Sequence, residues 1–277
     1  MSEPKRTSET TTKTPSKTKI RVEGISKQFD QAGSPVQALS NVDLTIREGE
    51  FVSIAGPSGC GKSTLLYMLG GFLEPSSGRM LVDGKPVAGP GVDRGVVFQE
   101  YALFPWLTVF DNIAYGLRES RMSAQAVRTT AERYIALIGL SGFEHRFPRE
   151  LSGGMKQRVA LARTFAYEPD ILLLDEPFGA LDAQTREIMQ DELLRLWRTT
   201  GKTVLMVTHD VSEAVYLSNR VCVMSQRPGR IVKEFAIDLH HNVEREAVVL
   251  SEAYTAIRNA VWLAVRQQVT VPPRSNP

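Results

Sequence analysis

The sequence predicts an α/β fold: a mixed β-sheet with flanking helices, an antiparallel β subdomain and an inserted α-helical subdomain. Three observations predict it. Residues 20–55 form short runs of alternating apolar and polar residues, which are typical of strands. β-rich apolar runs return at 171–174 and 204–207 with a helical pattern between them, and such alternation implies parallel strands covered by helices. From 109 to 166 the apolar residues follow a helical period, which indicates an insertion into this core.

Strands dominate the first third of the chain. We expect them at 20–22, 42–46, 51–55, 80–82 and 95–98. Asp83 and Gly84, residue types that favour tight hairpin turns, follow the fourth of these strands. A short helix is expected from Thr64 to Gly70, because apolar residues recur there directly after a glycine-rich loop.

Helical periodicity governs the middle of the chain. The apolar positions that show it are Ile113, Leu117, Val127, Ala131, Tyr134, Ile135, Ile138, Val159, Leu161, Ala162 and Phe165. A helix at 183–197 lies between the two later strands, and another strand is expected at 231–237. Residues 245–269 predict one terminal helix, whose apolar stripe is expected to pack on the core rather than to bind a cofactor.

Composition limits the possible classes of function. The chain has 277 residues, of which 42% are hydrophobic, and this suits one large domain or two small ones. A formal net charge of +2 is too small to indicate nucleic acid as a partner. No apolar run approaches the roughly eighteen residues that span a bilayer, so any membrane role is expected to come through a partner. Cys60 and Cys222 are isolated thiols, which fits a reducing cytosol, and residues 1–19 predict a disordered leader.

A complete phosphate-loop motif, G-x-x-x-x-G-K-[ST], follows the strand at 51–55. The loop consists of Gly56, Pro57, Ser58, Gly59, Cys60, Gly61, Lys62, Ser63 and Thr64. Its glycines let the backbone turn N–H groups inward, and the next helix places its positive end under the phosphates. Lys62 is a mobile cation for the β- and γ-phosphates, and Ser63 offers a hydroxyl group to Mg²⁺. Because a simple glycine turn would not need all these positions, the motif predicts a P-loop NTPase core.

Two acidic residues and a histidine follow neighbouring strands of this core. Asp175 and Glu176 come directly after the strand at 171–174, and a carboxylate at such a strand end faces the ligand crevice. Asp175 is placed to hold Mg²⁺, and Glu176 to act as general base on an attacking water molecule. His209 follows the strand at 204–207 and reaches the same edge. Acidic residues also cap strands and isolated histidines lie on surfaces, but the phosphate loop favours catalysis here.

A second glycine motif stands far downstream. Ser152, Gly153 and Gly154 precede a helix that is expected to begin near Lys156, so that a serine cap and two glycines offer a second anion-binding helix end. With the phosphate loop, and in this order, the motif makes residues 20–237 resemble the ATPases of ATP-binding cassette (ABC) transporters. Met155 stands where that family usually has glutamine, and we expect ATP capping to survive the change, with the loss of a polar contact as the alternative.

The resemblance implies roles for further residues. It implies that Phe29 stacks on adenine, with a core phenylalanine as the alternative. It further implies that Gln99 contacts Mg²⁺ and water, that His209 contacts the γ-phosphate, and that Asp182 belongs to a loop linking two ATP sites. The implied domains are an ABC ATPase domain at 20–240, with a RecA-like core at about 20–98 and 167–240 and a helical subdomain at about 99–166, and a C-terminal helical tail at 241–277.

The same resemblance implies the cofactors and partners. ATP with Mg²⁺ is held between two copies of the chain, or between this chain and a homologous ATPase subunit, and Ser152 and Gly154 of one copy cap the γ-phosphate of the other. Transmembrane permease subunits convert closure of the dimer into transport, and a periplasmic or extracytoplasmic solute-binding protein delivers the cargo. The subunit is then peripheral, at the cytoplasmic face of the inner (plasma) membrane.

Three stretches, 104–109, 215–220 and 224–231, are similar to the ATPases of nitrate, sulfonate and taurine importers. The expected cargo is therefore a small anion of this kind, with a pyrimidine precursor or another organic acid as the alternative. A soluble ABC ATPase is disfavoured by the single cassette and the modest charge. The second glycine motif disfavours a kinase or GTPase, because neither class needs it. Glu176 disfavours a non-catalytic nucleotide-binding module, which would not need a general base.

One apolar segment follows Gln99 directly. Residues 101–106 are unusually apolar for this position. We expect Phe104 and Trp106 to line a groove for a coupling helix of the permease; the alternative is that the segment packs beneath the helical insertion.

Overall fold

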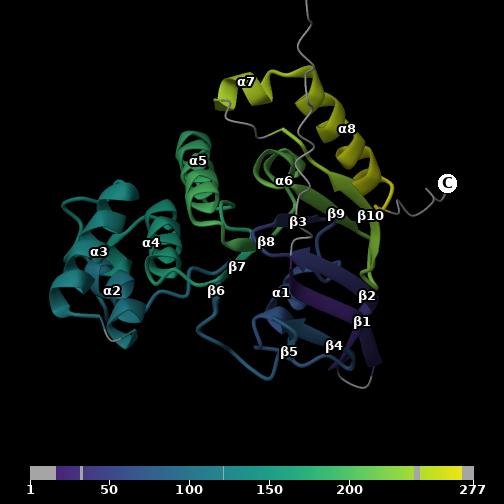
Figure 1. Cartoon of the computed structure of the whole chain (residues 1–277), viewed down its shortest axis with the longest axis horizontal. Coiled ribbons are helices and arrows are strands. Elements are labelled where there is room, and N and C mark those ends of the chain that lie inside the picture. Colours follow the sequence, from purple (N-terminus) through teal and green to yellow (C-terminus); the bar gives the residue numbers. More distant parts are fainter. Residues whose placement is uncertain (1–16, 32–33, 121, 240–243, 270–277) are drawn as a thin grey trace, which may run out of the picture.

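The structure is a computed structural model that describes residues 17–31, 34–120, 122–239 and 244–269. Figure 1 shows a core of two sheets with helices around them and a group of helices to one side. This arrangement confirms the predicted fold class. Most of the leader predicted at 1–19 lies outside the described residues, but Thr18 and Lys19 already belong to the first strand.

Within the described residues the strands form two sheets. The smaller sheet has the order β2-β1-β4-β5 with antiparallel pairs, and the larger has the order β10-β9-β3-β8-β7-β6. The strands are β1 (Thr18–Gln31), β2 (Ser34–Arg47), β3 (Phe51–Ala55), β4 (Ser77–Val82), β5 (Lys85–Pro86), β6 (Arg94–Val97), β7 (Ile171–Asp175), β8 (Thr203–Thr208), β9 (Arg220–Met224) and β10 (Ile231–Ala236). The helices are α1 (Lys62–Leu69), α2 (Val109–Glu119), α3 (Ala124–Leu137), α4 (Gly153–Ala166), α5 (Ala183–Thr200), α6 (Val211–Leu217), α7 (Arg245–Val249) and α8 (Glu252–Arg266).

The register of the larger sheet brings three strand ends together. β3 pairs in parallel with β8, so that Ala55 stands beside Thr208, and β7 pairs in parallel with β8, so that Asp175 stands beside Val207. Because the carboxyl ends of parallel strands meet at one edge, the loops that follow β3, β7 and β8 share a crevice. The antiparallel strand β10 makes the sheet mixed.

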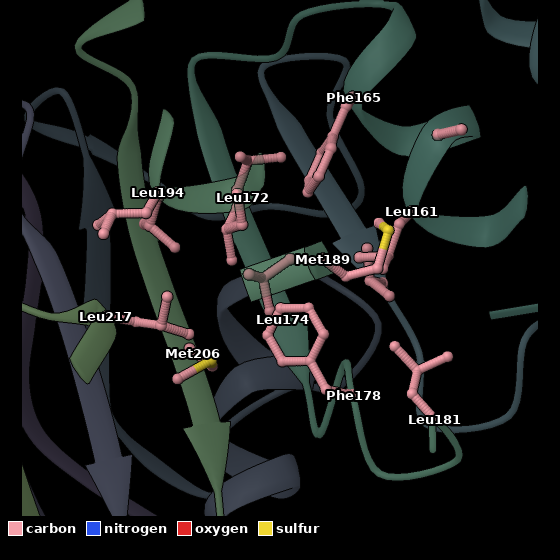
Figure 2. Packing of buried hydrophobic residues seen from close by; sticks show 14 of the residues in the cluster. Leu161, Phe165, Leu172, Leu174, Phe178, Leu181, Met189, Leu194, Met206 and Leu217 are labelled. Carbon is pink, nitrogen blue, oxygen red and sulfur yellow. The ribbon is translucent and has the colours of Figure 1, made fainter. Parts of the chain in front are cut away.

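Apolar cores cover both faces of the larger sheet, which explains why its central strands are almost continuously apolar. In β7, Ile171 and Leu173 belong to the core that α1 and the antiparallel sheet share, whereas Leu172 and Leu174 belong to the core on the opposite face. Figure 2 shows the second core, in which Leu172, Leu174 and Met206 lie close to Phe178, Met189 and Leu194.

The helices α2, α3 and α4 stand beside the core in Figure 1 and come from the part of the chain in which helical periodicity was expected. The helix α4 begins at Gly153, earlier than the predicted start near Lys156. Ser152 has an extended backbone, and its side chain accepts a hydrogen bond from the N–H of Met155 at 3.3 Å. This cap compensates for the low helix propensity of the two glycines.

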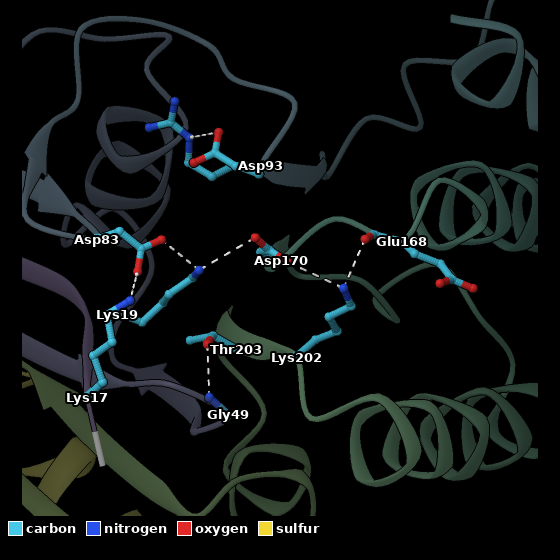
Figure 3. Close-up of polar contacts among 10 residues, drawn as sticks. Lys17, Lys19, Gly49, Asp83, Asp93, Glu168, Asp170, Lys202 and Thr203 are labelled. Carbon is cyan, nitrogen blue, oxygen red and sulfur yellow. Dashed lines mark hydrogen bonds and ion pairs between the residues drawn. The ribbon is translucent and has the colours of Figure 1, made fainter. Parts of the chain in front are cut away.

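Charged side chains tie the sheets together at the edge where β7 and β8 begin. Figure 3 shows Lys19 between two carboxylates: its Nζ lies 2.7 Å from Asp83 Oδ2 and 3.6 Å from Asp170 Oδ2. Lys202 Nζ lies 3.5 Å from Asp170 Oδ1. Since Asp170 is largely exposed, these pairs contribute modestly to stability, and of the three the pair between Lys19 and Asp170 joins the two sheets. The crevice lies at the opposite edge, where β7 and β8 end.

The C-terminal part forms two helices where one was predicted. The helix α7 ends at Val249, and Ser251 caps α8 by accepting a hydrogen bond from the N–H of Tyr254 at 3.1 Å. A serine that bonds to the backbone in this way favours a new helix start over continuation of the old one. The predicted packing of the apolar stripe is confirmed, because Val261 and Ala264 are buried in the core.

Candidate functional site: a nucleotide cleft at the strand ends

A cleft with a volume of about 610 Å³ opens at the carboxyl edge of the larger sheet. It brings together residues from the phosphate loop, from the ends of β7 and β8, and from the antiparallel sheet. The residues that line it are Phe29, Val36, Ala38, Ser58, Gly59, Gly61, Lys62, Ser63, Thr64, Gln99, Glu176, His209 and Arg227.

The backbone of the phosphate loop depends on glycine at two positions. Gly59 has a φ of 73° and Gly61 a φ of 105°, a left-handed region that side chains disfavour. A Cβ at Gly61 would also lie 2.6 Å from Leu39 Cδ2. The helix α1 begins immediately afterwards at Lys62, so its positive end points into the cleft.

The ammonium group of Lys62 is held inside this loop. Its Nζ donates hydrogen bonds to the carbonyl oxygens of Gly56 at 2.8 Å and Pro57 at 3.0 Å, and the residue is 5% exposed. The carbonyl oxygens of the loop thereby hold this ammonium group in place, and Cys60 Sγ lies 4.0 Å from its Nζ. The site therefore offers an anion a positioned charge with little competing water.

Ser63 and Asp175 meet beneath the cleft. Ser63 Oγ donates a hydrogen bond to Asp175 Oδ1 at 2.9 Å, and Asp175 is fully buried. Burial raises the pKa of the Asp175 carboxyl group, although hydrogen bonds to it and the nearby charge of Lys62 oppose this shift. Among the described residues, Asp175 Oδ2 has no hydrogen-bond partner. A hydroxyl group beside an unpaired carboxylate oxygen is a donor set that fits Mg²⁺.

Glu176, Gln99 and His209 converge above that pair. His209 Nδ1 lies 3.1 Å and Gln99 Nε2 lies 3.4 Å from the same carboxylate oxygen, Glu176 Oε2. Glu176 has a φ of 47°, unusual for a residue with a side chain. Its N–H donates to the carbonyl of Val207 in β8 at 2.9 Å, which holds this backbone in place.

The aromatic side chain predicted to stack on adenine lines the same cleft. Phe29 lies near the end of β1 and is half-buried rather than part of the core. Lys27 Nζ stands 5.2 Å from the centre of its ring. The core alternative for Phe29 is therefore not what the structure shows.

The second glycine motif and Asp182 lie outside this cleft. Ser152 and Gly153 are exposed at the start of α4, and Asp182 is exposed at the start of α5, where its side chain accepts a hydrogen bond from the N–H of Thr185 at 3.0 Å. That bond lowers the pKa of Asp182. One chain therefore presents two separate groups of predicted site residues.

Some loop positions do not face the cleft, and three cleft residues, Val36, Ala38 and Arg227, escaped prediction. Gly56, Pro57 and Cys60 belong to the loop without lining the cleft, and Cys60 is buried. Arg227 does line it: its Nε and Nη2 atoms donate to the carbonyl of Gly59 at 3.2 and 3.1 Å. The sequence pattern around Arg227 indicates only a turn, and no local signal links it to a loop so far away in the chain.

A strand, a glycine loop and a helix, with carboxylates at the end of another parallel strand of the same sheet, define a phosphate-loop nucleoside triphosphatase. The family model described as "ABC transporter" matches residues 39–179. An uncharacterized ABC transporter ATP-binding protein of Methanocaldococcus jannaschii is 50% identical over 243 residues, which cover 88% of this chain and 91% of that protein. The taurine import ATP-binding protein TauB of Ruegeria pomeroyi is 47% identical over 246 residues, which cover 87% of this chain and 92% of that protein.

A solved structure shares the fold. The dimeric ATP-binding cassette MJ0796, bound to ADP and Pi in a post-hydrolysis state, matches with a TM-score of 0.73 and 34% identity over 79% of this chain and 99% of that one. The chain belongs to the ABC transporter family, and it is an ATP-binding protein whose ATP hydrolysis is coupled to transport. Each described helix is too short or too polar to cross a membrane.

Proposed function

We propose that the chain is the ATPase subunit of an importer for a small anion such as taurine, another sulfonate or nitrate. The observation that carries the proposal is the 47% identity to the taurine import protein TauB of Ruegeria pomeroyi across 87% of the chain. A taurine import ATP-binding protein TauB of Burkholderia pseudomallei, 51% identical over 220 residues, supports the same cargo class. A pyrimidine precursor or another organic acid is the alternative cargo.

Disruption of the gene in its own organism tests the cargo. We expect the mutant to lose uptake of labelled taurine, an alkanesulfonate or nitrate, and the wild-type chain to restore it. A chain carrying Glu176→Gln is the matched control, because it should fold and bind ATP without supporting transport. Normal uptake of all three solutes, together with loss of uptake of an organic acid or a pyrimidine, would contradict the proposed cargo.

The cleft suggests how the chain's own residues act on ATP. Lys62 and the first N–H groups of α1 bind the phosphates, and Phe29 contacts the base. Ser63 and Asp175, with Gln99, would hold Mg²⁺, which neutralises phosphate charge. Glu176 orients the attacking water and accepts its proton, while His209 supports developing charge on the γ-phosphate. Phosphoryl transfer depends mainly on such positioning and electrostatics.

A second copy of the chain completes the site in this proposal. Exposed Ser152 and half-buried Gly154, at the start of α4, would cap the γ-phosphate that the other copy binds, and Asp182 would lie between the two sites. The dimeric state of the cassette MJ0796 supports such an arrangement. The remaining proposed partners are transmembrane permease subunits and, indirectly, an extracytoplasmic solute-binding protein, with the subunit peripheral to the cytoplasmic face of the inner membrane.

An exposed aromatic cluster suits a permease helix. Trp106 is 70% exposed, and the ring of Phe104 lies 5.7 Å from Trp106 and 4.7 Å from Tyr115. Beneath them Asn112 is fully buried, and its side chain bonds to the backbone of Phe104, Leu107 and Thr108. A rigid segment that nonetheless exposes a tryptophan supports a docking surface, and half-buried Phe104 supplies its base.

Replacing both Phe104 and Trp106 by alanine tests this surface. We expect the double variant to bind ATP normally but to lose co-purification with the permease, because buried aromatic anchors dominate such interfaces. Trp262→Ala, at a 48% exposed tryptophan on α8, is the matched control and should leave the complex intact. Unchanged assembly of the double variant would exclude the docking role. Failure of the wild-type chain to purify with any membrane protein would favour a soluble, non-transport ABC ATPase.

A further inference from the structure

A buried carboxyl group stands behind the turn that carries His209. Thr208 ends β8, His209 follows it, and Asp210 caps α6. Glu213, in the first turn of α6, is 7% exposed and does not line the cleft. Its side chain turns back toward the strand, where the Thr208 hydroxyl group donates to Glu213 Oε2 at 2.8 Å.

These contacts form an unusual helix cap. In the common capping box, the glutamate three residues after the cap accepts directly from the N–H of the cap residue. Here the N–H of Asp210 donates to Thr208 Oγ1 at 3.0 Å, and the Thr208 hydroxyl group in turn donates to Glu213 Oε2. Asp210 Oδ1 in turn accepts from the N–H of Glu213 at 3.2 Å. The residues on both sides of His209 are thereby fixed by one carboxyl group.

A glutamate at this buried position carries a desolvation cost. Glu213 Oε1 is buried and lacks a hydrogen-bond partner among the described residues. Burial raises the pKa of Glu213 to about 8, a shift that the hydrogen bond from Thr208 and the charge of Arg186 oppose and the charges of Asp210 and Glu176 reinforce. Because an apolar residue of similar size would fill the same space without this penalty, packing alone does not explain the residue.

His209 needs support from its backbone. Its side chain is 60% exposed, and its Nδ1 contacts Glu176 Oε2 at 3.1 Å. An imidazole with so little packing keeps this position only if the turn beneath it is rigid. We propose that Glu213 is a positioning residue for ATP hydrolysis, which acts through the Thr208 hydroxyl group to hold His209 against Glu176. The proposal rests on the catalytic role proposed above for His209.

Two variants break the contact from its two ends. Glu213→Ala and Thr208→Val are each expected to lower kcat about 10-fold while the KM for ATP stays within about twofold, because a small displacement of a catalytic group slows chemistry more than binding. The double variant should be no slower than either single variant, since both remove the same contact. Glu213→Gln keeps a hydrogen bond to Thr208 and should retain kcat within about threefold.

A spectroscopic readout separates positioning from general damage. In the full-length chain labelled at histidine, we expect the imidazole resonances of His209, assigned with H209Q, to move in E213A and T208V. Tyr216→Phe is the matched control, because it removes another hydroxyl contact of α6, the 2.7 Å bond to Asp191, away from this turn. It should leave the His209 resonances and kcat unchanged.

Three results would overturn the proposal. Unmoved His209 resonances in E213A would show that Glu213 does not position the imidazole. Losses that multiply in the E213A/T208V variant would show that the two residues act separately. Moved resonances with an unchanged kcat would refute the catalytic role of His209, and the proposal with it, while leaving the cargo and partner proposals untouched.

Discussion

We expect Glu176→Gln to reduce the turnover of ATP by about 10²-fold or more, the usual contribution of a general base. The amide has nearly the same shape as the carboxylate, so contacts with Gln99 and His209 can persist, but it cannot accept the proton of water. ATP binding should be retained, because Glu176 makes no hydrogen bond or ion pair with Lys62 or with the rest of the phosphate loop among the described residues. Steady-state hydrolysis and equilibrium ATP binding, measured on the same preparation, check both expectations.

The same variant should make the ATP-bound dimer detectable. With hydrolysis blocked, Mg-ATP is expected to hold two copies together, which size-exclusion chromatography with light scattering detects. Glu132→Gln, at an exposed position of α3, is the matched control and should turn over normally and stay monomeric with ATP. Near-normal hydrolysis by the Glu176 variant would remove its assignment as general base. A chain that stays monomeric with Mg-ATP, even beside its permease, would refute the proposed arrangement of ATP between two copies.

Lys62→Ala should weaken ATP binding by about 10²-fold. Hydrogen bonds that involve charged groups contribute about 1.5–3 kcal/mol each, and the ammonium group is the buried cation of this loop. Its loss also leaves the carbonyl oxygens of Gly56 and Pro57 without the donor that they share.

Calorimetric titration with Mg-ATP measures the effect. Lys233→Ala, which removes an exposed lysine from β10, is the matched control for the change in net charge and should bind like the wild type. If the Lys62 variant bound ATP as tightly as the control, the loop amides alone would account for phosphate binding.

Features of the fold that depend on residues close together in the sequence could be predicted from the sequence. The strand at 51–55 and its loop are local patterns, and the structure has β3 over Phe51–Ala55. Helix ends were harder, because single hydrogen bonds decide them. Ser152 starts α4 at Gly153 despite two poor helix formers, and Ser251 divides an apolar stripe that otherwise predicts one helix.

The cleft shows the same division. Asp175 and His209 could be placed from the rule for parallel strand ends, and both lie at the expected edge. Arg227 could not be placed, because it meets Gly59 only through the pairing of β9 with β3. Glu213 has the sequence signal of a helix start, but its burial and its indirect contact through Thr208 depend on tertiary packing.

The left-handed backbone at Glu176 has an evolutionary consequence. At a φ of 47° a residue with a Cβ is strained by about 1 kcal/mol, and glycine or asparagine would relieve much of that strain. Either replacement would also remove the carboxylate. If Glu176 is the general base proposed above, either replacement is expected to raise the free energy of unfolding while stopping hydrolysis, so that selection for ATP turnover would retain the acid.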